Sequence, residues 1–272
     1  MQHSTFKSLN SEASISPCGI FQAEATSMQK VLILGATSPI ARALALKFAY
    51  DGARLYLAAR DAGEAQRVAE DVCFRAGVGT LSGTFDAVDF ASHDEFIRHA
   101  ANELGGLDGV VVCFGTLGDE DAAQTDPDAA IATIHQNFTG AVSLITLAAR
   151  HLEQQHSGFI IVLGSVAGDR GRARNYVYGS AKGALAIFAQ GLRGRLAKSN
   201  VHVMTVTLGT VDTRMTWGRE GALLTIPPAR AADSIYAAYR KRREVVYVPW
   251  FWRVIMAVIR LIPERQFKRV KF

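Results

Sequence analysis

The chain has 272 residues, which is enough for one large α/β domain with a full core. Its net charge of +5 is modest, and many basic residues lie near the C-terminus, so the charge indicates a local feature and not a nucleic-acid-binding surface. Cys18, Cys73 and Cys113 are widely spaced and form no CxxC pair, so neither a disulfide framework nor a metal site is supported. A reducing, cytoplasmic compartment is expected.

Residues 1–28 are polar and contain neither an apolar run nor a helical period. We expect a disordered leader here, with Met28 as a candidate functional start. A secretory signal requires a continuous apolar stretch near its beginning, so export is not indicated.

From Lys30 onward, short runs rich in Val, Ile and Leu alternate with longer stretches in which apolar residues recur every three or four positions. This rhythm predicts strands at 30–34, 54–59, 79–85, 109–114, 159–164, 201–208 and 245–248, and long helices at about 128–154 and 176–198. Most of these strands are apolar on both faces, as is typical of a parallel sheet between two helical layers. The prediction is a single α/β domain over residues 29–249, a Rossmann-type doubly wound parallel sheet, with ligands beyond the carboxyl ends of its strands.

The segment GATSPIA, residues 35–41, connects the first strand to the first helix. Gly35 supplies a tight bend, Pro39 fits the first helical position, and Ala41 is an accepted substitute for a glycine that allows close helix packing. Backbone donors at the helix N-terminus and the hydroxyls of Thr37 and Ser38 could hold a pyrophosphate. Taken alone the segment is weak, because a purely structural turn can have the same pattern.

Tyr178 and Lys182 lie four residues apart at the start of a predicted helix and therefore share one face. An ammonium beside a tyrosine stabilises the phenolate and lowers a pKa that is about 10 in free solution, toward the range useful for proton transfer. Ser165 follows the fifth strand directly, which predicts its hydroxyl over the same crevice. A Tyr/Lys pair at this spacing is common by chance, and a surface pair is the alternative.

Taken together, these elements resemble the short-chain dehydrogenase/reductase family over nearly the whole chain from about residue 30. The matching positions are Gly35, Asp86 in FDAVD, Gly115 in CFGTLG, Asn137 in HQNFTG, Ser165, Tyr178 and Lys182. The thirteen-residue spacing from Ser165 to Tyr178 is also the usual one in that family.

The resemblance implies a catalytic tetrad. Tyr178 would donate a proton to the substrate carbonyl oxygen, which Ser165 would polarise. Lys182 would hold the cofactor ribose and tune Tyr178, and Asn137 would keep a relay water in place. Cofactor contacts are implied at Gly35, Thr37, Ser38, Ile40, Arg60, Asp86, Ala87, Gly115, Tyr178, Lys182, Gly209, Val211 and Thr213. A homo-oligomer is implied as well.

The sequence departs from the family pattern in the first turn, in CFG where NAG is usual, and at Leu208, where a proline normally frames the nicotinamide. The type of nicotinamide cofactor depends on the end of the second strand, where NAD-preferring members place an acidic residue. Ala59 occupies that position, and Arg60 could meet a 2′-phosphate bidentately, which favours NADP. Asp61 and the absence of a basic residue in the first turn leave NAD open.

Three segments, FGTLGDEDAAQ, SVAGDRGRARNYVYGSAK and PWFWRVIMAVIRLIPERQFKR, more narrowly resemble the reductase component of decaprenylphosphoryl-ribose 2′-epimerases. That resemblance implies reduction of a polyprenyl-phosphate-linked 2-keto pentose in cell-wall or polysaccharide biosynthesis, with an oxidase partner. Arg172 and Arg174, just before Tyr178, could meet the substrate phosphate, or they could be solvated loop charges. The alternatives are a reductase of another hydrophobic ketone, steroid or acyl, and a non-catalytic dinucleotide-binding subunit.

Residues 250–272 join aromatic residues, the apolar segment VIMAVIRLIP and several basic residues. The apolar segment is shorter than the about 20 residues that a spanning helix needs. It predicts an amphipathic C-terminal helix that could lie at the inner face of the membrane as a peripheral contact. The alternative is a helix that closes the substrate pocket or packs on another subunit.

Overall fold

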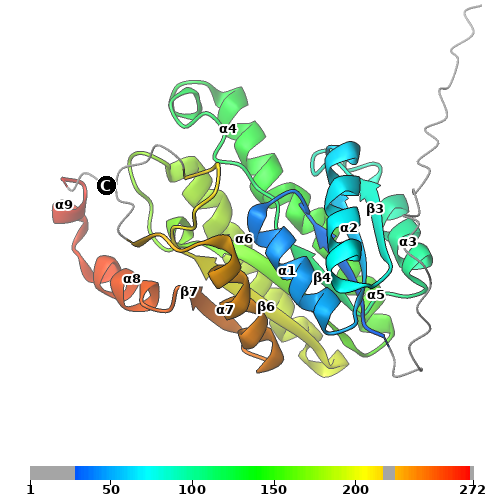
Figure 1. The fold of residues 1–272 in the computed structure, drawn as a ribbon. Coiled ribbons are helices and arrows are strands. Elements are labelled where there is room, and N and C mark those ends of the chain that lie inside the picture. Colours follow the sequence, from blue (N-terminus) through cyan, green and yellow to red (C-terminus); the bar gives the residue numbers. More distant parts are fainter. Residues whose placement is uncertain (1–27, 217–223, 270–272) are drawn as a thin grey trace, which may run out of the picture.

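One parallel sheet forms the centre of the protein, with strands in the order β3-β2-β1-β4-β5-β6-β7 (Figure 1). The computed structural model describes residues 28–216 and 224–269. The strands are β1 (Lys30–Leu34), β2 (Arg54–Ala59), β3 (Thr80–Thr84), β4 (Gly109–Val112), β5 (Gly158–Ser165), β6 (Val201–Leu208) and β7 (Val245–Val248). All neighbouring strands run parallel, so every carboxyl end lies at the same edge of the sheet.

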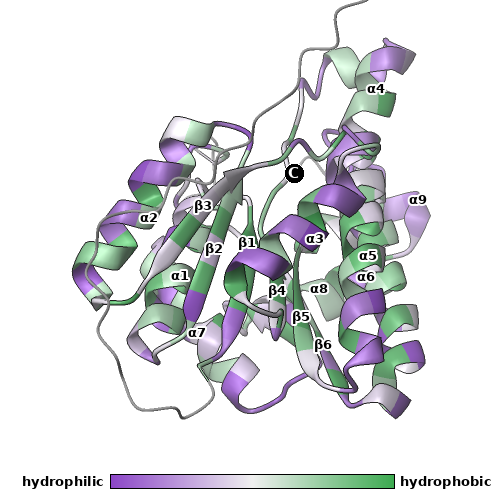
Figure 2. Ribbon diagram, turned by 90° about the vertical axis from the view of Figure 1, so that its right-hand side faces the viewer, coloured by the Kyte–Doolittle hydropathy of each residue, from purple (hydrophilic) through white to green (hydrophobic). Residues whose placement is uncertain are grey.

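Helices cover both faces of the sheet, and β1 shows why its residues are apolar throughout. Val31 and Ile33 pack in the core on one face, and Leu32 and Leu34 pack in the core on the other. The first core contains α1 (Pro39–Tyr50), α2 (Ala62–Ala76) and α7 (Pro228–Arg240), and the second contains α3 (His93–Leu104), α5 (Gly140–Gln154) and α6 (Tyr176–Leu196). Figure 2 shows the largely hydrophobic strands between these layers. The predicted doubly wound α/β fold is confirmed.

Strand order reverses between β1 and β4, since the chain builds outward from β1 to β3 and then returns to continue from β4. In a doubly wound sheet this switch point opens a crevice at the carboxyl ends. The predicted fourth strand was two residues too long, because β4 ends at Val112 and the chain then turns over this crevice.

The prediction of one helix over 128–154 was wrong. The segment divides into α4 (Pro127–Ile134), a π-helical turn (His135–Thr139) and α5. A π turn inserts one extra residue and is often found at functional sites. At the start of α5 a Cβ on Gly140 would lie 2.1 Å from the carbonyl oxygen of Ala87, so glycine permits this close approach.

The C-terminal segment forms two helices, α8 (Trp252–Leu261) and α9 (Glu264–Phe267), and Figure 1 shows α8 beside β7 at the edge of the sheet. Met256, Ile259 and Phe267 are buried in a small core with Val166, the residue after β5. The predicted leader lies outside the described residues except for Met28, and residues 270–272 of the predicted tail lie outside them too. Among the helices that the structure describes, none combines the length and apolar character needed to cross a membrane.

Candidate active site

A cavity of about 320 Å³ opens at the switch point between β1 and β4. Most of the predicted cofactor contacts line it: Gly35, Thr37, Ser38, Ile40, Arg60, Asp86, Ala87, Gly115, Tyr178, Lys182 and Thr213. These residues come from the ends of five strands and the starts of two helices, which the fold brings to one edge. The first turn and the helix that carries Tyr178 therefore line the same cavity.

The first turn is bent so that α1 points its N-terminus at the cavity. Gly35 has φ +83° and donates its N–H to the carbonyl oxygen of Ala58 (2.8 Å). A Cβ at Gly35 would lie 2.7 Å from the backbone nitrogen of Phe114, so only glycine fits here. Ser38 precedes α1 without capping it through its side chain, and the first turn of α1 contains no acidic residue. Free donors and a positive helix end are the features that bind a pyrophosphate.

The end of β2 forms the adjacent rim. Arg60 is exposed there and lines the cavity. The Asp61 carboxylate accepts a hydrogen bond from the N–H of Glu64 (2.9 Å) and caps α2. The Asp61 carboxylate is therefore used as a helix cap. This argues against Asp61 as the acidic residue that binds the cofactor ribose in NAD enzymes.

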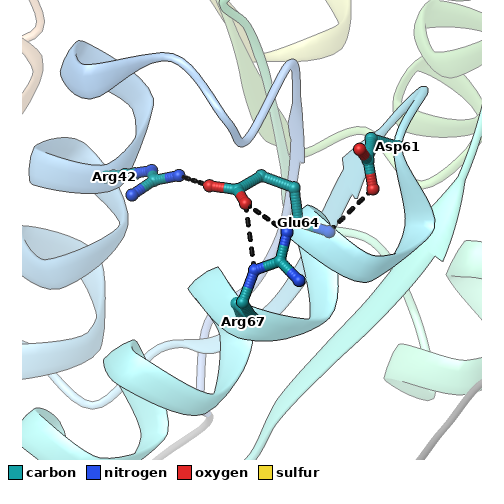
Figure 3. Close-up of polar contacts among 4 residues, drawn as sticks. All are labelled: Arg42, Asp61, Glu64 and Arg67. Carbon is teal, nitrogen blue, oxygen red and sulfur yellow. Dashed lines mark hydrogen bonds and ion pairs between the residues drawn. The ribbon is translucent and has the colours of Figure 1, made fainter.

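Three further side chains form an ion-pair cluster beside this rim, shown in Figure 3. The Glu64 carboxylate lies between the guanidinium groups of Arg42 from α1 and Arg67 from α2, and it accepts hydrogen bonds from both. Arg67 Nη2 lies 2.6 Å from Glu64 Oε2. Both arginines lower the pKa of the Glu64 carboxyl, Arg67 most strongly.

Asn137 is buried in the π-helical turn and is held by three hydrogen bonds. Its Oδ1 accepts from the N–H of Thr116 (3.0 Å), and its Nδ2 donates to the carbonyl oxygens of Thr116 (2.7 Å) and Thr133 (2.8 Å). Gly115 lies against it: a Cβ there would be 2.7 Å from Asn137 Oδ1 and 3.1 Å from Lys182 Nζ. The absence of a side chain at Gly115 thus permits Asn137 Oδ1 and Lys182 Nζ to lie close to the same point. Asn137 itself does not line the cavity.

Tyr178 and Lys182 are buried on the first turns of α6 and face the cavity. Lys182 Nζ lies 5.9 Å from the centroid of the Tyr178 ring and donates a hydrogen bond to the carbonyl oxygen of Leu163 (3.3 Å). Burial lowers the pKa of Lys182 from 10.5 to about 8. Burial also raises the pKa of the neighbouring Cys113 thiol to about 12, so this residue stays uncharged beside the lysine. The surface-pair alternative for Tyr178 and Lys182 is therefore excluded.

Ser165 ends β5, and its Oγ accepts a hydrogen bond from the N–H of Ala167 (3.2 Å). The turn that follows presses against α6: a Cβ on Gly168 would lie 2.7 Å from the Gly183 nitrogen, and a Cβ on Gly179 would lie 2.7 Å from the Ala167 carbonyl oxygen. Glycines on both sides therefore allow the turn after Ser165 to pack closely against α6, the helix that carries Tyr178 and Lys182.

Six of the predicted site residues do not line the cavity: Asn137 and Ser165, described above, and Gly209, Val211, Arg172 and Arg174. Gly209 is covered by the Trp252 indole, and Val211 is buried in a bridge to Ile226. Arg172 is half-buried against α8, where its Nη2 lies 3.7 Å from the sulfur of Met256. Burial lowers the pKa of its guanidinium, and the nearby Asp169 opposes this. Arg174 is exposed, with its Nε 3.9 Å from a Glu120 oxygen.

Arg174 and Glu120 line a second, smaller hollow together with Asn175, Tyr176 and Tyr178. Arg174 is thus exposed beside this hollow, whereas Arg172 is engaged by the C-terminal helix.

The cavity also includes residues that the sequence prediction did not name as contacts. They are Pro39, Ala59, Phe85, Cys113, Phe114, Gln136, Leu163, Gly164, Leu208, Arg214 and Met215. Their common signal is position, since most lie in the last residues of a strand or within two residues after it. Cys113 and Phe114 could have been found this way, because they form the CFG segment that departs from the family pattern.

Comparisons with known proteins agree with this geometry. Residues 29–222 match the family model described as short chain dehydrogenase. An uncharacterized oxidoreductase of Mycobacterium tuberculosis is 35% identical over 245 residues, covering 90% of this chain and 98% of the relative. An uncharacterized oxidoreductase of Streptomyces coelicolor is 35% identical over 243 residues, covering 89% and 96%.

Among solved structures, a short-chain dehydrogenase from Sphingobium yanoikuyae in complex with NADPH has the same fold. Its TM-score is 0.74 at 24% identity, with 87% of this chain and 97% of that chain covered.

Proposed function

The chain belongs to the short-chain dehydrogenase family, and from this premise we propose that it is an NADPH-dependent carbonyl reductase that acts on a lipid-linked keto sugar. Membership of the family makes it an oxidoreductase of CH–OH and C=O groups with a nicotinamide cofactor. The observation that carries the proposal is the pair of buried side chains, Tyr178 and Lys182, facing the cavity opposite the first turn.

The residues present fit a dinucleotide. The open N-terminus of α1 and the Ser38 hydroxyl suit the pyrophosphate, and Gly35 gives the turn before α1 its tight bend beside Phe114. Lys182 is placed to hold the nicotinamide ribose. When bound, the reduced nicotinamide supplies the hydride that goes to the carbonyl carbon.

Tyr178 supplies the proton. Its hydroxyl donates to the carbonyl oxygen as the hydride arrives, so the product is the neutral alcohol. The Lys182 ammonium stabilises the phenolate left behind, and the Ser165 hydroxyl orients the carbonyl oxygen. Asn137 is fixed by its three hydrogen bonds and would position the water through which Tyr178 regains its proton.

Tyr178→Phe tests this role, with Tyr50→Phe as a matched control because Tyr50 is an exposed tyrosine at the end of α1 that lines neither the cavity nor the hollow beside Arg174. General acid catalysis typically contributes 10² to 10⁴-fold, so Tyr178→Phe should lower kcat by about that factor without changing the dissociation constant of NADPH. The control should keep normal kcat. A decrease in kcat smaller than about tenfold in Tyr178→Phe would show that Tyr178 is not the proton donor.

The preference for NADPH over NADH is proposed on Arg60, which lies on the cavity rim, and on Asp61, whose carboxylate is occupied as a helix cap. A charge-assisted hydrogen bond is worth about 1.5 to 3 kcal/mol. Arg60→Ala should therefore weaken NADPH binding at least tenfold and leave NADH binding unchanged. Wild-type protein that binds NADH more tightly than NADPH would refute the preference.

The lipid-linked substrate is proposed on the resemblance of three segments and on the position of Arg174 beside the hollow that reaches Tyr178. A substrate phosphate bound here would displace the Glu120 carboxylate from its ion pair with Arg174. Reduction of a polyprenyl-phosphate 2-keto pentose should have a lower KM than reduction of its dephosphorylated form, and Arg174→Gln should abolish that difference. Equal KM values for both substrates in the wild type would contradict the proposal.

A second candidate, reduction of an uncharged hydrophobic ketone, is favoured by one observation. Glu120 already partly neutralises Arg174, and Arg172 packs on Met256. A panel of steroid and acyl ketones in the same assay separates the two candidates, because the uncharged substrates would then be turned over fastest.

Membrane contact is proposed on the outer face of α8. Trp250, Val254, Val258 and Leu261 form an apolar stripe at helical spacing, each between 57% and 83% exposed. Exposed basic residues flank it: Arg253, Arg260, Arg265, Lys268 and Arg269. Such a combination suits an anionic lipid surface, where each basic residue is worth about 1 kcal/mol.

Val258→Glu tests the contact without disturbing the packed face of α8. It should abolish co-sedimentation with anionic vesicles at low salt, whereas Ile187→Glu, at an exposed apolar residue of α6, should not. Equal sedimentation of both variants and the wild type would show that the stripe does not touch lipid.

A further inference from the structure

The ion-pair cluster of Arg42, Glu64 and Arg67 has no part in the chemistry described above. It joins two helices beside the rim where Arg60 stands, and it contains two cations for one carboxylate (Figure 3). Surface ion pairs contribute little to stability, with a typical value below about 1 kcal/mol, so stability alone is a weak reason for this arrangement.

The helix geometry directs Arg42 toward the cavity rim. Ser38 lines the cavity, and the N–H of Arg42 donates to the Ser38 carbonyl oxygen (2.9 Å), so Arg42 lies one turn further along the same face of α1. Side chains on a helix lean toward its N-terminus, which here is the cavity end. Glu64 stands in the first turn of α2, four residues after Arg60. Arg42 and Arg60 thus approach the rim from two different elements.

The cluster can release Arg42 at small cost. Arg67 donates two hydrogen bonds to Glu64 Oε2, at 3.0 and 2.6 Å, whereas Arg42 contacts Oε1, so release of Arg42 does not require the Arg67 contacts to break. The Arg42 and Arg67 side chains are 44% and 66% exposed, so water can replace either contact. A phosphate monoester with close to two negative charges competes well for Arg42 against a single carboxylate that already has a partner.

We propose that Arg42 is a second cation for the 2′-phosphate of NADPH and that Glu64 is its resident competitor, which sets the strength of the preference for NADPH. The proposal rests on the NADPH preference proposed above and adds two specificity-determining residues to it. In the free protein Glu64 holds Arg42. With NADPH bound, Arg42 turns to the phosphate and Glu64 stays paired with Arg67.

Removal of the carboxylate could act in two opposite ways. Glu64 repels the incoming phosphate, but it also holds Arg42 near the rim. Because the pair is exposed, Glu64 orders the Arg42 side chain only weakly. The Glu64 carboxylate would lie within one Debye length of the 2′-phosphate and would repel both of its negative charges. Repulsion is therefore the larger effect, and Glu64→Gln should bind NADPH more tightly than the wild type.

The test is direct titration of NADPH and NADH into the cofactor-free protein, for wild type, Arg42→Gln, Glu64→Gln and Arg75→Gln. Arg75 is the matched control, since it is an exposed arginine of α2 in an ion pair with Asp71 at the far end of the helix. We expect Arg42→Gln to weaken NADPH binding about tenfold and Glu64→Gln to tighten it about threefold, with less than twofold change for NADH. Arg75→Gln should change neither dissociation constant by more than about twofold.

Four outcomes would overturn the inference. Unchanged NADPH binding in Arg42→Gln, or an equal loss for both cofactors, removes Arg42 from the phosphate site. Weaker NADPH binding in Glu64→Gln shows that the carboxylate positions Arg42 and does not compete. If Arg60→Ala abolishes the NADPH preference while Arg42→Gln leaves it intact, the proposed function stands and this inference falls. A wild type that prefers NADH refutes both. Melting temperatures of all variants, measured in the same buffer, confirm that the folds are equivalent.

Discussion

Replacement of Lys182 by methionine should stabilise the cofactor-free protein while abolishing turnover. The ammonium of Lys182 is buried, and burial lowers its pKa from 10.5 to about 8. One unit of pKa corresponds to about 1.4 kcal/mol, so the buried Lys182 charge lowers the free energy of unfolding by about 3 kcal/mol at neutral pH. Methionine has a similar length and leaves no cavity. The substitution also loses the hydrogen bond to Leu163, worth about 1 kcal/mol, so a net gain of about 2 kcal/mol is expected.

The sign of the pH dependence makes this prediction specific. The folded state loses the Lys182 proton near pH 8, whereas the unfolded chain keeps it until about pH 10.5. Wild-type stability attributable to Lys182 is therefore lowest below pH 8 and recovers as the pH rises toward 10.5. The advantage of Lys182→Met should be about 2 kcal/mol at pH 7 and should become a small disadvantage by pH 10.5, where only the lost hydrogen bond to Leu163 remains.

Urea unfolding without cofactor, at a series of pH values from 7 to 10.5, measures this difference. Lys198→Met serves as the control, because Lys198 is exposed and its replacement should change stability by less than about 0.5 kcal/mol at any pH. A Lys182→Met protein that is less stable than the wild type at pH 7, or whose advantage is independent of pH, would refute the reasoning.

Two further substitutions test the packing around the site. Gly115→Ala should lower kcat at least tenfold, because the added methyl group would lie 2.7 Å from Asn137 Oδ1; Gly171→Ala, with no atom within 4 Å of the added group, should keep normal kcat in the same steady-state assay. Arg170→Met should destabilise the protein by about 2 kcal/mol in thermal unfolding, because Arg170 donates to the Ile259 carbonyl oxygen (2.5 Å) and lies over the Phe267 ring at 3.9 Å. A melting temperature as high as that of the exposed-site control Arg265→Met would contradict this role for Arg170.

Local patterns in the sequence were sufficient for the sheet and for much of the cavity wall. The strands were recognisable because both faces of most are buried, which leaves runs such as residues 31–34 and 159–163 apolar throughout. The first turn and the Tyr178–Lys182 pair were recognisable because each depends on residues close in the sequence: a glycine at a required bend, a proline at a helix start, and two side chains one turn apart.

Only the tertiary structure decided how these local pieces meet. No spacing predicts that Asn137 reaches Gly115, because that contact needs the π turn between α4 and α5. The lowered pKa of Lys182 depends on burial beneath the ends of β4 and β5, and the amphipathic C-terminal helix gives no sign in its own sequence that Met256 will pack on Val166 and Arg172. Such contacts join residues far apart in the chain. Their geometry follows from the packing of whole helices and strands, which a periodic sequence pattern does not specify.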